Sequence, residues 1–142
     1  DQMVQAARSG KQNIAEASMA SAHSKETEIK LTSVARASLE ELLIDYQDFL
    51  RTKKLKQWER NHKFSLRFDE LNKTPNATYA TFQKAIENPE PEICANVMIC
   101  LIKVTTWLLG RQMQALEKAF IKEGGLRERM TKARINERNK KK

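Results

Sequence analysis

The side chains that most often do chemistry in proteins are few in this chain, and they are not grouped. The two histidines, His23 and His62, have no second histidine or cysteine at helical spacing. Cys94 and Cys100 lie six residues apart in one apolar segment, so they would face different sides of a helix. This spacing excludes an intrahelical disulfide and a paired metal site. No Gly-rich phosphate loop or nucleophile elbow occurs in the sequence, so no metal, cofactor or catalytic group is predicted.

Paired acids are the remaining candidates for catalysis. Glu26 and Glu28, and the neighbours Glu40 and Glu41, fall on the predicted solvent-facing sides of helices. Bundles that hold metal ions with carboxylates need a Glu-x-x-His sequence on each of two helices, and this chain has that sequence once, at Glu59 to His62. We therefore interpret these acids as solvated side chains. An enzyme with an unrecognised site is the least favoured of three functional hypotheses.

Positive charge is the strongest functional signal. The formal net charge is +8, and it is concentrated in residues 51–67 and 127–142, each of which carries +6. Segregated basic charge favours an anionic partner such as nucleic acid, although solvated faces and a frayed tail would give the same pattern. The predicted phosphate contacts are Lys53, Lys54, Lys56, Arg60 and Lys63 in the first stretch, and Arg127, Arg129, Lys132 and Arg134 in the second. Trp58 could stack on a base or anchor the core.

The elements that must carry these residues are helices. Residues 25–53 place Leu31, Leu39 and Leu42 in a seam of apolar residues with heptad-like spacing. Long helices are also predicted for residues 1–20 and 92–123, with a helical insertion between the second and the third. The expected fold is all-α, of the up-down four-helix-bundle type, with no sheet.

Domain organisation follows from the same pattern. We expect a helical bundle domain over residues 1–123, a helical insertion at 54–91 and a basic helix or tail over 124–142. The apolar run from Ile93 to Leu109 is interpreted as too short and too polar to span a bilayer. Two free cysteines and no secretory signal favour a reducing, cytoplasmic location.

Three stretches resemble one bacterial family, the four helix bundle proteins related to those encoded in rRNA intervening sequences. They are DQMVQAARSGKQNIAEAS at 1–18, SKETEIKLTSVARASLEELLIDYQDFL at 24–50, and ANVMICLIKVTTWLLGRQMQALEKAFIKEGGLRERM at 95–130. The narrower likeness is to the branch called four helix bundle suffix domain proteins. A distant branch includes the accessory variability protein of diversity-generating retroelements, which is basic and partners a reverse transcriptase. The resemblance implies a homo-oligomer, such as a pentameric ring, and implies no particular reaction.

The chain departs from this family at two points. Members usually have Gly where this chain has Ala17, and Ala should let the first helix run on. Members also carry a helix before the first residue of this chain, so we expect an N-terminally truncated bundle. The motif residues Gln12, Asn13, Ile14 and Glu16 are expected to serve packing or an oligomer interface, with ligand binding as the alternative.

A missing helix would leave an apolar groove open to water. The expected lining is Ile14, Leu39, Leu42, Val97 and Leu101. Large exposed apolar patches are rare on soluble monomers, so something should fill this groove. An upstream segment is favoured over another subunit or the 54–91 insertion.

These observations favour a non-enzymatic, oligomeric adaptor. It would bind nucleic acid, RNA in the first place, or a nucleic-acid-processing protein through its basic surfaces. The alternative is a scaffold that binds only proteins and meets an acidic partner with the same surfaces. Neither hypothesis includes a membrane or a small-molecule substrate.

Overall fold

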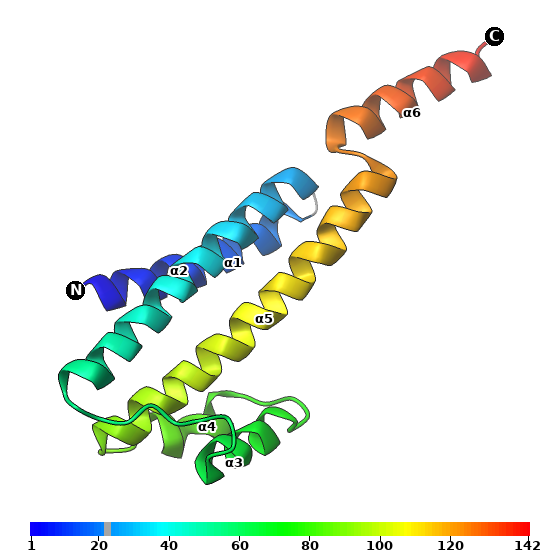
Figure 1. The fold of residues 1–142 in the computed structure, drawn as a ribbon. Helices are drawn as coiled ribbons and strands as arrows, with labels where there is room; N and C mark the ends of the chain where they lie inside the picture. Colours follow the sequence, from blue (N-terminus) through cyan, green and yellow to red (C-terminus); the bar gives the residue numbers. More distant parts are fainter. Residues whose placement is uncertain (22–23) are drawn as a thin grey trace. The chain divides into compact units, whose positions relative to one another are not determined.

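The structure is a computed structural model that describes residues 1–21 and 24–142 (Figure 1). Within these residues there are six helices and no strand. Their bounds are α1 Gln2–Ala20, α2 Lys25–Thr52, α3 Lys63–Asn72, α4 Tyr79–Ile86, α5 Pro91–Glu123 and α6 Leu126–Lys140. The predicted all-α class is confirmed. The three long helices and the helical insertion also lie where the sequence placed them.

Local signals explain where the helices begin and end. The Ser24 hydroxyl accepts a hydrogen bond from the Thr27 N–H (3.2 Å), so Ser24 caps α2 as its residue type favours. Part of the predicted turn around residues 21–24 lies outside the described residues. Gly124 has a φ of 76° and donates its N–H to the Phe120 carbonyl (2.8 Å), which ends α5. Ala17 is buried within α1, which continues to Ala20 as expected.

The described residues form two compact units. The first unit comprises residues 1–39 and 107–142, and the second comprises residues 40–106. Helices α2 and α5 each contribute one part to either unit. The predicted domain boundary at residues 123 and 124 stays a prediction.

In the first unit, α1 packs on the first part of α2 through small side chains. Ala6, Gly10 and Ala17 are buried on one face of α1, and Ala35 is fully buried on α2. Glu28 of α2 is also buried, at 7% exposed, so the prediction that this acid is solvated is wrong. A Cβ atom at Gly10 would lie 3.2 Å from a methyl carbon of Leu39, which shows how closely the two helices approach. An ion pair between Lys25 and Glu123 joins the start of α2 to the end of α5.

In the second unit, the first part of α5 is buried on two sides. Ala95 and Ile99 pack with Leu50 of α2. Val97, on another face of α5, packs with Phe68 of α3 and Phe82 of α4, whose rings lie 5.4 Å apart.

The predicted groove differs from what the structure shows. Leu42 and Val97 are buried, and α3 and α4 of the insertion cover Val97 and pack against Leu101. Ile14 is 38% exposed and belongs to the other unit. Leu42 and Val97 therefore do not line an open groove as expected, because both are buried within the second unit and α3 and α4 lie against Val97.

The helical segment Pro91–Lys140 contains a window of 18 residues that is apolar and long enough to cross a membrane, by length and composition alone. The run from Ile93 to Leu109 is less polar in the folded helix than its composition suggests. Thr105 and Thr106 donate their hydroxyls to the carbonyls of Leu101 and Ile102, both at 2.8 Å, so these groups are satisfied within the helix. The core helix of a soluble bundle has the same length and composition.

Candidate nucleic-acid interface

The first basic stretch begins where α2 ends. Leu55 N–H donates to the Leu50 carbonyl (2.8 Å) and Lys54 N–H donates to the Arg51 carbonyl (3.1 Å). These two bonds, with an apolar contact between Leu50 and Leu55, form a Schellman motif. Lys54 takes the left-handed position, with a φ of 55°, which glycine usually occupies. The chain therefore leaves the helix in a fixed direction and at some cost in backbone strain.

Asn96 of α5 then holds the next segment in place. It is 1% exposed, and its side chain bonds to the backbone of the basic stretch at two points. The Trp58 N–H donates to Asn96 Oδ1 (2.7 Å), and Asn96 Nδ2 donates to the Lys56 carbonyl (2.9 Å). A third bond runs from Asn96 Nδ2 to the Glu92 carbonyl (2.8 Å). A buried amide that is satisfied in this way rigidifies its surroundings, so the backbone at Lys56 to Trp58 is fixed.

Glu92 adds a further contact to the same segment. Its Oε1 atom accepts a hydrogen bond from the Lys56 N–H (2.8 Å). The bond uses the backbone of Lys56, and the side chain of Lys56 is exposed. The segment thus presents cations outward while its backbone groups bond inward.

Three aromatic rings lie at the end of the clamped segment and just after it. Trp58 and His62 are stacked with ring centres 5.0 Å apart and planes within 2°. Phe64 lies 5.4 Å from both rings, and the Lys63 ammonium group lies 5.0 Å from the centre of the Phe64 ring. The His62 Nδ1 atom also accepts the Phe64 N–H (3.2 Å) at the start of α3. Trp58 packs against the cluster of Phe68, which agrees with the anchoring alternative for this residue.

The predicted phosphate contacts fall into two groups. Those of the first stretch are exposed and lie within eleven consecutive residues of the second unit: Lys53, Lys54, Lys56, Arg60 and Lys63. Those of the second stretch are exposed on α6, which belongs to the first unit: Arg127, Arg129, Lys132 and Arg134. Every residue of α6 is exposed, so its charges have no buried anchor comparable to Asn96.

The family-motif residues lie on different sides of α1. Asn13 is half-buried, and its Nδ2 atom donates to the carbonyl (2.8 Å) and the hydroxyl (3.2 Å) of Ser9. The Ser9 hydroxyl in turn lies 2.9 Å from the Ser38 hydroxyl of α2. Gln12, Ile14 and Glu16 are exposed. Asn13 thus belongs to the contact between α1 and α2.

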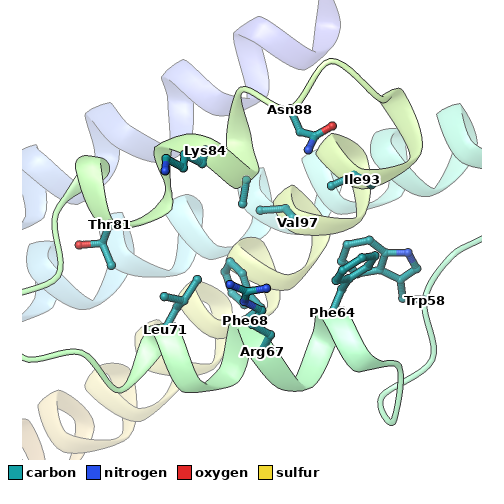
Figure 2. A pocket seen from close by; sticks show the side chains of 11 residues that line it. Trp58, Phe64, Arg67, Phe68, Leu71, Thr81, Lys84, Asn88, Ile93 and Val97 are labelled. Carbon is teal, nitrogen blue, oxygen red and sulfur yellow. The ribbon is translucent and has the colours of Figure 1, made fainter.

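A pocket of about 380 Å³ opens beside the aromatic rings in the second unit (Figure 2). One helix face supplies each wall. Phe64 and Arg67 are three residues apart on α3, Thr81 and Lys84 are three apart on α4, and Val97 comes from α5. Sequence reasoning missed this pocket and the role of Asn96. The available signals were an Asn within an apolar run and an Arg-Phe pair at helical spacing.

The second unit also holds two cysteines, Cys94 and Cys100. Burial raises the pKa of the Cys100 thiol. The Cys94 thiol is half-buried and donates to the Ile86 carbonyl (3.0 Å). Among residues 1–21 and 24–142, no three His, Cys, Asp or Glu side chains are grouped so that they could hold a metal ion.

Comparisons with protein-family models, with curated proteins and with solved structures found no match. The family resemblance drawn from the three sequence stretches therefore stays a prediction.

Proposed function

We propose that the protein is an oligomeric adaptor that binds RNA through the basic segment, defined as residues 53–63, and that it acts by binding rather than by catalysis. The proposal is supported above all by the Asn96 clamp. A fixed backbone loses little conformational entropy when its side chains engage a ligand. The exposed cations of this segment can therefore meet phosphates without first being ordered. The helix α6 supplies a second basic surface.

Oligomer formation is supported by the apolar surface of the first unit. Met19 is 70% exposed, Trp107 is 59% exposed and Ile121 is 83% exposed. Exposed apolar side chains in such numbers are typical of surfaces that bind other proteins. We infer that further copies of this chain cover them, and sedimentation of the purified protein should give a mass above that of the monomer.

The RNA-binding proposal is tested by charge reversal. We expect Lys53→Glu, Lys54→Glu and Lys56→Glu, combined, to lower the affinity for single-stranded RNA by at least about tenfold. Binding should also become less sensitive to salt: the slope of log affinity against log salt concentration is negative, and its magnitude should fall by about 2. The reason is that about 0.7 counterions are released per phosphate contact, and three contacts are lost. Fluorescence anisotropy at several salt concentrations measures both quantities.

The matched control carries the same change in net charge elsewhere. Lys11→Glu, Lys30→Glu and Lys118→Glu also change exposed residues, and they lie outside the basic segment. Equal losses in the two triple variants would mean that only net charge matters. Unchanged affinity in the first variant would favour the protein-binding scaffold instead.

A further inference from the structure

The pocket beside the basic segment has two kinds of wall. Its floor is apolar, and includes Phe68, Leu71 and Val97. Its charged lining residues are Arg67 on α3 and Lys84 on α4, and no carboxylate is among the described residues that line it. We propose that this pocket binds one nucleotide, with the base against the apolar floor and the phosphate between Arg67 and Lys84. This inference rests on the proposed function and names the ligand of its site.

The apolar part fits a flat ring. The rings of Trp58 and Phe64 form one end of the pocket, and Figure 2 shows them at the opposite end from Thr81 and Leu71. A volume of about 380 Å³ lies in the range of sites for small organic ligands. Bases bind to proteins through their π faces on such surfaces, and all four bases have one.

The charged part fits a phosphate. Arg67 and Lys84 come from different helices, and neither side chain makes an ion pair or a hydrogen bond with the residues that the structure describes. Two cations that line one cleft without a counterion repel each other. An anion that binds between them offsets this repulsion, so the cleft attracts anions. The guanidinium of Arg67 can bond a phosphate with two N–H groups, and the ammonium of Lys84 adds a point charge.

The position of the pocket selects a nucleotide over other anions with a ring. Lys63 lies over the ring of Phe64, so the basic segment and the pocket share one edge. A strand whose phosphates follow the basic segment would deliver its next base to this edge. A base within a duplex is paired and stacked, and cannot enter without leaving the helix. The pocket therefore predicts a preference for single strands.

Trp58 allows the inference to be tested directly. The chain has two tryptophans, and Trp107→Phe leaves Trp58 as the single indole. Adenosine monophosphate added to this variant should quench Trp58 fluorescence in a saturable way, whereas adenosine or inorganic phosphate alone should quench far less. Arg67→Gln or Lys84→Gln should weaken this binding by about tenfold, as expected when a charge-assisted hydrogen bond is lost. Lys73→Gln changes an exposed lysine outside the pocket and should leave it unchanged.

Oligonucleotides distinguish a free nucleotide from one within a strand. Single-stranded RNA should bind more tightly than the same strand with abasic sites, and more tightly than the duplex. If the abasic strand binds equally well and adenosine monophosphate does not quench Trp58, the pocket inference is overturned while the RNA-binding proposal stands. If the mononucleotide binds in the pocket and no oligonucleotide binds, the inference stands for a free nucleotide and the RNA-binding proposal fails.

Discussion

The second unit buries aromatic and branched side chains, whereas the first unit buries mostly small or polar ones. The buried hydrophobic residues of the second unit include Leu42, Leu50, Phe68, Phe82, Val97, Ile99 and Ile102. Those of the first unit include Ala6, Ala17 and Ala35, with Leu109 as the large one among the described residues, and Thr32 and Ser38 are buried with them. The two units therefore use different sources of stability.

The exposed side chains show the opposite pattern. Fourteen large apolar side chains are exposed among the described residues, and ten of them belong to the first unit. Large apolar side chains contribute about 1.5–3 kcal/mol each when they are fully buried. In the first unit, many large apolar side chains are exposed and do not make this contribution within one chain. Its helices pack through small side chains that allow a close approach instead. The second unit is the one that resembles a self-contained core.

The largest expected effect tests this contrast with two aromatic residues. Phe68→Ala should lower the free energy of unfolding by about 3–5 kcal/mol, because it leaves a cavity among Phe82 and Val97. Trp107→Ala should change it by less than about 0.5 kcal/mol, because the side chain is mostly exposed. Chemical denaturation of dilute protein measures both. Equal losses in the free energy of unfolding would contradict the difference in packing between the two units.

Asn96 tests the polar part of the second unit. Asn96→Leu should lower the free energy of unfolding by about 2–3 kcal/mol, because it removes three hydrogen bonds and leaves the Trp58 N–H without its partner. Asn61→Leu is the control, since Asn61 is exposed. RNA affinity should also fall in Asn96→Leu measured below its unfolding transition. A variant as stable as the unchanged protein would mean that water replaces the clamp.

The sequence was sufficient to predict the helices but not the contacts across them. The seam of Leu31, Leu39 and Leu42 predicts a long helix from spacing alone, and the Ser24 cap marks its start. The role of Asn96 depends on a segment nearly forty residues earlier in the chain, and no local pattern connects the two. Residues this far apart in sequence meet only in the folded chain.

The candidate site shows the same limit. Exposed cations of the basic segment follow from composition, because charged side chains rarely pack inside a protein. The pocket does not follow, since Arg67 and Lys84 lie on separate short helices whose packing depends on Phe68 and Phe82. The left-handed Lys54 was also missed, because glycine is the residue that usually signals such a helix end.

Substitutions of Lys54 should affect stability and RNA binding in different ways. Lys54→Gly should raise the free energy of unfolding by about 0.5–1 kcal/mol, since glycine adopts the positive φ without strain. The same change should weaken RNA binding by removing one cation. Lys54→Ala removes the charge but keeps the strain, so it should weaken binding without stabilising the protein. Thermal melts and anisotropy together test both expectations, and a stabilised Lys54→Ala would contradict the strain.

The close approach of α1 and α2 should give a smaller effect. Alanine favours a helix over glycine by about 1 kcal/mol. At Gly10 the new Cβ would lie 3.2 Å from Leu39, so we expect a net gain below about 0.5 kcal/mol. At Gly110 the nearest atom, Cζ of Arg36, is 3.4 Å away, and most of the gain should remain. A larger gain at Gly10 than at Gly110 would mean that the helices are not closely packed there.

The smallest effects should appear at the extremes of pH, and on opposite sides for the two units. In the first unit, the hydrogen bond and charge of Lys25 hold the pKa of Glu123 below its ordinary value of 4.5. This contribution to stability is present above pH 4.5 and is lost as the pH falls through the lowered pKa. In the second unit, burial first and then the charge of Cys94 raise the pKa of Tyr46 above 10.0. Its contribution is complete below pH 10.0 and is lost as the pH rises through the raised pKa.

Titration of each group by nuclear magnetic resonance checks the two directions. Lys25→Met removes the charge beside Glu123, so the pKa of that carboxyl should return toward 4.5 while the pKa of Tyr46 is unchanged. Glu123 is about half exposed, so water and salt screen the pair and the effect on stability should be small. Added salt should therefore shift the pKa of Glu123 more than that of Tyr46, whose shift comes mainly from burial. Equal sensitivity to salt at both positions would mean that the first unit protects its ion pair as fully as the second protects its buried tyrosine.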